Sequence, residues 1–277
     1  MSDPVPAIAE ASATGAVAEL FADIRRVLGV EVVNLIWRHL ATIPNALPWA
    51  WGILRPLYTD GSIAAEAQAL RGQLALPRLP PFPPNLLSVI ELDGDDVVSI
   101  RNILAAYDRT NAMALVALSA LLSRLDEPPA TTDRIAEGRP VLSPEPVTPI
   151  PLPPLPSLDA LPDPVACLVL TLNRLGTRRD NPVLASMYRH LAHWPAYLAL
   201  SWALIGPLDA NGSLQQAIAD ALAKAQARAT SLAVRLQAPP IDVTTADAIR
   251  RAVEPFAGDV IARMVVICAL LRAATAP

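Results

Sequence analysis

The sequence has few of the residues on which common catalytic and metal sites depend. Its 277 residues include 3 histidines and 2 cysteines, and no CxxC motif occurs, so neither a zinc site nor a thiol redox pair is predicted. Cys167 and Cys268 each lie in an apolar helical pattern and are expected to be buried thiols. A glycine-rich phosphate loop and a GxSxG motif are also missing. We therefore expect no metal and no cofactor.

Charged residues are scarce as well, at 17% of the chain with a net charge of −4. No lysine or arginine cluster lies on any one element, so nucleic acid is not an expected partner. The N-terminus has neither a basic start nor an apolar h-region, which favours a cytoplasmic protein. The longest stretch without Asp, Glu, Lys or Arg, residues 190–208, contains Pro195 and Pro207, so we expect no membrane span. The 53% of hydrophobic residues is compatible with a homodimer that covers apolar surface.

One segment of the chain occurs twice. Residues 36–63 and 187–214 align without a gap at a constant separation of 151 residues, as from Arg38 to Arg189. The matched pairs include His39 with His190, Pro44 with Pro195, Trp51 with Trp202, Pro56 with Pro207, and Gly61 with Gly212. Residues 100–107 (IRNILAAY) also resemble residues 249–256 (IRRAVEPF), at a separation of 149 residues. We interpret this as an internal duplication that forms an intrachain pseudo-dimer of two helical repeats packed face to face.

Helix signals dominate and no long strand-like alternation occurs, so the predicted fold class is all-α. The first repeat, residues 1–125, is expected to contain helices at 15–28, 32–42, 45–58, 62–76, 93–107 and 111–125, with a proline-rich loop at 77–85. The second repeat, residues 165–277, is expected to contain helices at 165–175, 183–193, 196–208, 213–236, 246–254 and 256–274. Between them lies a linker, residues 126–164, whose dense prolines exclude helix and favour an extended strap along a surface.

The duplicated Arg-His pairs allow two interpretations. Arg38-His39 and Arg189-His190 either line a pocket in the seam between the repeats, or hold the repeats together and cap helix ends. The residues alone leave both interpretations open.

Three segments resemble the group I 2-haloacid dehalogenases. They are DIRRVLGVEVVNLIWRHLATIPNALPWAW at residues 23–51, IRNILAAYDRTN at 100–111 and SMYRHLAHWPAYL at 186–198. The resemblance covers both halves, with the duplication and the long linker. It implies an all-helical pseudo-dimer with a pocket between the halves, which hydrolyses 2-halo acids of both configurations. In that family an aspartate activates a water that attacks the halogen-bearing carbon directly, with no ester intermediate.

The resemblance places Met187, between Ser186 and Tyr188, where the family has its catalytic aspartate. A thioether cannot accept a proton, and a general base is worth ~10²–10⁴ in rate, so the hydrolytic step needs another base. His190 is the candidate, since it lies three positions further along and on nearly the same helical face. Its pseudo-symmetric counterpart is His39.

The resemblance also suggests residues that would bind a substrate. Arg38 or Arg189 would neutralise a carboxylate, and Trp37 with Tyr188 would form a wall. The remaining positions are Val32 and Leu35, where the family has an aromatic wall, and Asn111, which either binds the substrate or caps a helix N-terminus. The carboxylates nearest in sequence to the proposed seam are Asp108, Asp180 and Asp209.

Two functions follow for a small carboxylic acid partner, halogenated or not. The chain is either a hydrolase of the 2-haloacid dehalogenase type with a relocated base, or a divergent relative that keeps the fold without the reaction. In the second case it binds a small organic acid or serves as a helical scaffold.

Overall fold

The structure is a computed structural model that describes residues 5–126 and 151–276, and over these ranges it contains helices and no strand, which confirms the all-α prediction. The helices of the first half are α1 (Gly15–Leu28), α2 (Leu35–Leu40), α3 (Ala46–Thr59), α4 (Ser62–Arg71), α5 (Pro84–Val89) and α6 (Gly94–Asp126). Those of the second half are α7 (Asp163–Asn173), α8 (Ser186–Leu191), α9 (Pro195–Ala210), α10 (Ser213–Ala233), α11 (Val243–Pro255) and α12 (Ala262–Ala274). Short 3-10 turns occur at Glu10–Ser12 and Leu158–Ala160, and a π-helical segment, η3 (Phe256–Ile261), joins α11 to α12.

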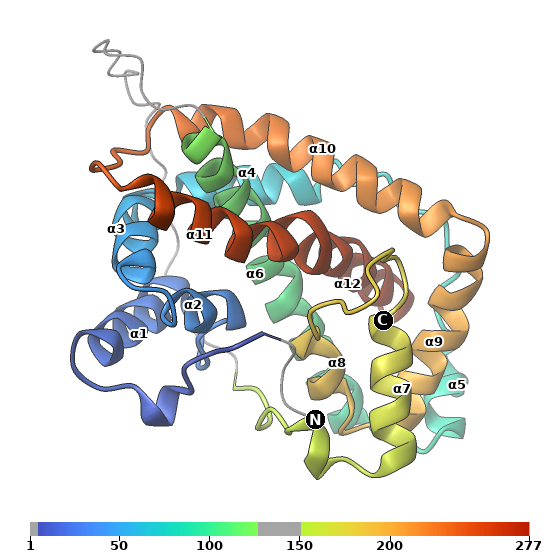
Figure 1. The fold of residues 1–277 in the computed structure, drawn as a ribbon. Helices are drawn as coiled ribbons and strands as arrows, with labels where there is room; N and C mark the ends of the chain where they lie inside the picture. Colours follow the sequence, from blue (N-terminus) through green and yellow to red (C-terminus); the bar gives the residue numbers. More distant parts are fainter. Residues whose placement is uncertain (1–4, 127–150, 277) are drawn as a thin grey trace.

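The long helices form the centre of the molecule. Figure 1 shows α1, α2 and α3 on the left and α7, α8 and α9 on the right, with α6, α11 and α12 crossing between them. Helix α10 packs against α6, α12 and α4. The buried apolar side chains of both halves form one continuous cluster, so the two halves share a core.

Helix α1 is fixed to α3 by one carboxylate. Asp23 accepts hydrogen bonds from Arg55 Nε at 2.7 Å and Trp51 Nε1 at 2.8 Å. The bond from Arg55 is the main cause that holds the pKa of Asp23 at about 2, against the opposing effect of burial. At the end of α1, Gly29 adopts a left-handed conformation with φ 62° and its N–H donates to the Arg25 carbonyl. Helix α1 ends here, and the loop that leads to α2 begins.

Helix α6 corrects the prediction of two helices at 93–107 and 111–125, because a single helix runs through Asp108, Arg109 and Thr110. The charge of the buried Asp108 is compensated by Arg71 at 2.7 Å and by Arg272. The Thr110 hydroxyl donates to the Ala106 carbonyl at 2.9 Å, inside the helix. Asn111 consequently lies in the middle of α6 and does not cap a helix.

Other element boundaries differ by less. The helix expected at 62–76 ends at Arg71, the helix expected at 32–42 is restricted to Leu35–Leu40, and α5 begins within the proline-rich loop. Cys268 is buried as predicted, but the prediction for Cys167 is wrong, because its position on α7 is exposed. Residues 127–150 of the linker lie outside the described ranges, and residues 151–157 precede the 3-10 turn without helix. Over the described residues, no helix is long and apolar enough to cross a membrane.

Candidate functional site

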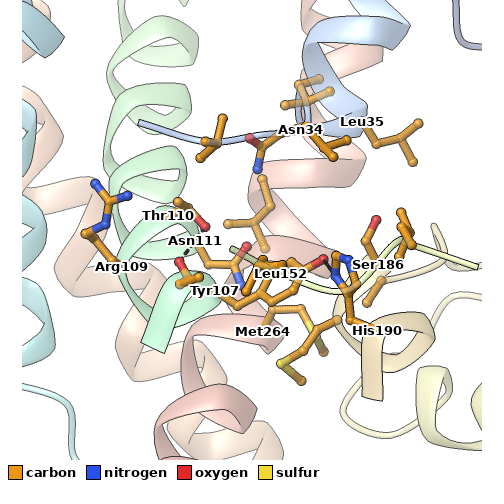
Figure 2. Close-up of a pocket in the computed structure, with 18 of the residues that line it drawn as sticks. Asn34, Leu35, Tyr107, Arg109, Thr110, Asn111, Leu152, Ser186, His190 and Met264 are labelled. Carbon is orange, nitrogen blue, oxygen red and sulfur yellow. Dashed lines mark hydrogen bonds between the residues drawn. The ribbon is translucent and has the colours of Figure 1, made fainter. Parts of the chain in front are cut away.

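Both halves of the chain line a cavity of about 580 Å³. The first half contributes the loop from Gly29 to Asn34, the start of α2 and the middle of α6. The second half contributes residues 183–187, His190 of α8, and residues of η3 and α12. Linker residues 152–155 complete the wall. Figure 2 shows Asn34 and Leu35 on one side and Ser186 and His190 on another, with Leu152 between α6 and α8.

Asn111 supplies a donor that has no partner within the described structure. Its side chain is 7% exposed, it lines the cavity, and its Nδ2 is buried without a hydrogen bond. Leaving such a group unpaired costs ~1–3 kcal/mol. A ligand that presents an acceptor at this point would satisfy the amide.

A hydrogen-bonded group of Tyr107, His190 and Ser186 faces the cavity. The Tyr107 hydroxyl lies 2.7 Å from His190 Nδ1. Ser186 also hydrogen-bonds to Tyr107, and His190 is hydrogen-bonded to the backbone of Pro153. A neutral imidazole has one N–H and one acceptor nitrogen. According to its tautomer, His190 either accepts a hydrogen bond from the Tyr107 hydroxyl or donates one to it.

This group is neutral at physiological pH. Burial lowers the pKa of His190 to about 4, assisted by the positive charges of His193 and Arg189 and opposed by the bond to Pro153. Burial also raises the pKa of the Tyr107 hydroxyl. The α8 end of the cavity can therefore donate and accept hydrogen bonds, but it carries no formal charge on these two side chains.

Arginine side chains give the cavity a positive region. Arg71 and Arg272 both pair with the buried carboxylate of Asp108. Arg109 donates to the carbonyls of Leu28 and Gly29 at 3.3 and 3.4 Å. Burial lowers the pKa of Arg109, and the charge of Arg71 adds to that effect. These three lining arginines, two of which share one aspartate, leave a net positive charge beside the cavity.

The structure brings together seven of the residues that the sequence indicated. Those that line the cavity are Val32, Leu35, Arg38, Asn111, Ser186, Met187 and His190. Four others do not line it: Trp37, His39, Tyr188 and Arg189. Trp37 packs edge-on against Trp51 with ring centroids 5.3 Å apart, and His39 stacks on Phe256 at 5.9 Å. The expected wall of Trp37 and Tyr188 is therefore not formed at this cavity.

Carboxylates are nearly missing from the described lining, where Glu31 of the exposed α1–α2 loop is the only one. Asp108, Asp180 and Asp209 do not line the cavity. Asp209 instead accepts from the Gly176 backbone at 2.7 Å and from Gln215 at 2.6 Å. No group of three metal-ligating side chains occurs within residues 5–126 and 151–276.

The sequence did not single out Tyr107, Arg71, Arg109 or Arg272 as site residues. Tyr107 lies four residues before Asn111, a spacing that places both on one face of a helix. That signal was hidden because the helix was expected to break between them. The arginines come from α4, α6 and α12, and no local pattern indicates that these helices converge.

Comparisons with known proteins find similarity to 2-haloacid dehalogenases. No family model matches the chain. A curated (R)-2-haloacid dehalogenase of Pseudomonas putida is 33% identical over 81 residues, which span 27% of this chain and 27% of that relative. A D-2-haloacid dehalogenase mutant in complex with D-2-CPA has a TM-score of 0.75 at 18% identity, covering 98% of this chain and 95% of that one. A crystal structure of a mutant D-2-haloacid dehalogenase has a TM-score of 0.78 at 17% identity, covering 99% of this chain and 97% of that one.

The chain has the fold of the D-2-haloacid dehalogenases. The resemblance noted from the sequence is thereby confirmed. The solved structures show the shared fold over nearly the whole chain, and the curated relative shows similar sequence over 81 residues. A further dehalogenase structure, in complex with L-LA, has a TM-score of 0.75 at 18% identity, covering 98% of this chain and 96% of that one. Within this dehalogenase fold, the cavity is the place where residues of both halves meet.

Proposed function

We propose that this chain is a 2-haloacid dehalogenase-like protein that binds a small carboxylic acid, halogenated or not, and lacks the base-assisted hydrolysis of that family. The observation that carries the proposal is the cavity lining, in which Asn111 presents an unpaired amide and Met187 occupies the position that the resemblance gives to the catalytic aspartate. Glu31, the one described carboxylate of the lining, lies on an exposed loop.

Binding follows from the chemistry of the lining. The Asn111 amide donates to a carboxylate or halide, and the arginines around the cavity attract the anion. The carbon skeleton replaces water against apolar side chains. Hydrolysis would further require a group that removes a proton from water, and the Met187 thioether has no such capacity.

A second candidate is a hydrolase in which His190 is the base. The observation in its favour is that His190 lines the cavity and is neutral, so one of its ring nitrogens is unprotonated. To act on water, Nδ1 must first release the Tyr107 hydroxyl. With a pKa of about 4, the ring is also a weaker base than an ordinary histidine.

We also propose that the fold arose by duplication into an intrachain pseudo-dimer, with repeats at 1–125 and 165–277 and the linker at 126–164. Helices α2 and α8 begin and end 151 residues apart, at Leu35–Leu40 and Ser186–Leu191. The turns that precede α4 and α10 also match, because Gly61 and Gly212 have φ of 79° and 81°. Asp60 and Asn211 each accept a backbone hydrogen bond from the serine two residues later.

The proposed function is tested with 2-chloropropionate as the probe. We expect the acid to raise the thermal midpoint of the wild-type protein and not that of Asn111→Leu, and we expect no halide release between pH 5 and 10. Met187→Asp is expected to gain halide release. Met264→Asp, which places the same group on another cavity methionine, is the matched control and should gain none.

Two results would overturn the proposal. Halide release by the wild-type protein that disappears in His190→Gln would establish the hydrolase with a histidine base. No stabilisation of the wild-type protein by any small carboxylate, together with an inactive Met187→Asp, would indicate a helical scaffold instead.

A further inference from the structure

The cavity is larger than a short haloacid requires. At ~30 Å³ for each non-hydrogen atom, the liquid-state share of a water molecule, the six heavy atoms of 2-chloropropionate need ~180 Å³. The cavity measures about 580 Å³, which falls within the ~300–1,000 Å³ typical of sites for much larger ligands. A three-carbon acid would therefore leave most of the space to water.

The inner surface of the cavity is poorly suited to hold that water. Buried apolar side chains from both halves line it, among them Val33, Leu184, Met187, Phe256, Val260 and Met264. Ordered water in a protein interior needs two to four polar partners. An apolar body of matching length would release this water and gain the free energy of burial.

The polar groups that compensate an anion are gathered away from Met187. Arg71 and Arg272 share the one carboxylate of Asp108, and Arg109 donates to the backbone carbonyls of Leu28 and Gly29. The Arg71 Nε is buried with no hydrogen-bond partner in the described structure. In Figure 2, Arg109 lies at the opposite end of the drawn residues from Ser186 and His190. The lining thus has a cationic end on α4, α6 and α12, and a mostly apolar remainder in which Arg38 donates to the Val33 carbonyl at 3.1 Å.

We infer that the acid bound here has an extended apolar body, of roughly six to ten carbons, with its carboxylate on Arg71, Arg109 and Arg272 and its body directed along the apolar lining toward Met187. This rests on the proposed function and specifies its ligand class. The arginine fork suits a carboxylate, and burial of the body supplies affinity that a short acid lacks.

Calorimetric titration of the full chain with propionate, hexanoate and decanoate tests the ligand class. Each buried methylene is expected to tighten binding roughly fourfold, so hexanoate should bind tens of times more tightly than propionate. If propionate binds and the longer acids bind equally or less well, the inference fails while the proposed function stands. If no acid binds, both fail.

Two pairs of variants test the placement. Ala106→Phe adds a ring to the cavity wall on α6 and should weaken hexanoate binding by at least about tenfold while sparing propionate. Ala199→Phe adds the same ring on the exposed face of α9 and should change neither. Equal loss of both acids in Ala106→Phe would contradict the inference.

At the cationic end, Arg71→Gln should weaken the binding of hexanoate about tenfold. Arg179→Gln, which removes an exposed arginine paired with Glu254, is the matched control and should have no effect. Undiminished binding by Arg71→Gln would overturn the placement of the carboxylate. Circular dichroism of each variant before titration distinguishes lost binding from lost folding.

Discussion

Two buried asparagines differ in the partners that their amides have. Asn173 at the end of α7 donates to the Val183 carbonyl at 3.2 Å and accepts from the Ala185 N–H at 3.0 Å. Asn111 in α6 is almost as buried, but its Nδ2 has no partner among the described residues. The first amide fixes the segment that leads into α8, whereas the second is free to contact a ligand.

Leucine at these two positions should therefore have different effects on stability. Asn173→Leu leaves a buried carbonyl and a buried N–H unpaired and should reduce the free energy of unfolding by about 2–4 kcal/mol. Asn111→Leu removes an already unpaired donor and should change it by less than about 1 kcal/mol. Urea denaturation of both variants measures the difference, and equal losses would contradict the assignment of Asn111 to ligand binding.

His190 makes stability depend on pH. Its pKa is about 4 in the folded protein against ~6.5 when unfolded, so the unfolded chain takes up the proton first as the pH falls. Stability is therefore complete above about pH 6.5 and is lost progressively down to about pH 4. The shift corresponds to about 3 kcal/mol.

His190→Gln, which cannot take up the proton, isolates this contribution. Between pH 7 and pH 4, the wild-type protein should lose about 3 kcal/mol more free energy of unfolding than the variant does. NMR titration of the histidine ring gives a direct check, and an apparent pKa near 6.5 for His190 would show that the ring is not held neutral by burial.

At this scale the repeat in the sequence indicated more symmetry than the cavity has. Arg38 and His190 line it, while their partners in the repeat, Arg189 and His39, do not. The His39 ring instead lies near Pro6, with Nδ1 2.6 Å from the carbonyl, and stacks on Phe256. Sequence matching finds equivalent places within each half, but it does not show which of two equivalent side chains faces the shared space.

At the scale of elements, the loop between α7 and α8 depends on one glycine. Gly176 has φ of +77°, and its N–H donates to Asp209. A Cβ there would lie 2.6 Å from Ile218 Cδ1 on α10. Backbone strain and crowding thus oppose any larger residue at this point.

Gly176→Ala is expected to destabilise the protein by about 1–3 kcal/mol. Gly52→Ala, inside α3 with open space around the added methyl group, should instead stabilise it by up to about 1 kcal/mol. Thermal denaturation of both variants compares the two glycines, and a neutral Gly176→Ala would show that the loop relaxes around the methyl group.

Most helices were predictable because apolar spacing and end signals coincide, as in α1, whose predicted bounds match. Failures occurred where a tertiary contact decides the local structure. Helix α6 continues through Asp108 because arginines from α4 and α12 compensate its charge. Likewise, α11 continues through Pro255 into a π-helical segment, although a proline normally ends a helix. That segment carries Phe256 and Val260 to the cavity.

At the scale of the whole molecule, ion pairs of α4, α10 and the residues next to them connect the halves. Arg228 pairs with Glu66 at 2.8 Å and Arg235 with Asp60 at 2.6 Å. Beneath them, α6 packs on both α10 and α12. The predicted repeats therefore do not have separate cores in the structure.

We expect one cooperative unfolding transition for the full chain. In scanning calorimetry the calorimetric and van't Hoff enthalpies should agree. Leu118→Ala, in the buried part of α6, should reduce the free energy of unfolding by about 2–5 kcal/mol and so lower the midpoint of the entire transition. Two separate transitions, only one of them shifted by this substitution, would show that each half folds by itself.

The wall at Leu152–Leu155 belongs to the covalent connection between the halves. His193 Nε2, two residues beyond α8, donates to the Pro154 carbonyl at 2.9 Å, and His190 in α8 is hydrogen-bonded to the backbone of Pro153. Two consecutive residues of this segment are therefore held at the end of α8. A protease that nicked this segment would cut the tether and breach the ligand chamber in one event. A ligand that fills the cavity should consequently make the chain more resistant to proteolysis at this segment.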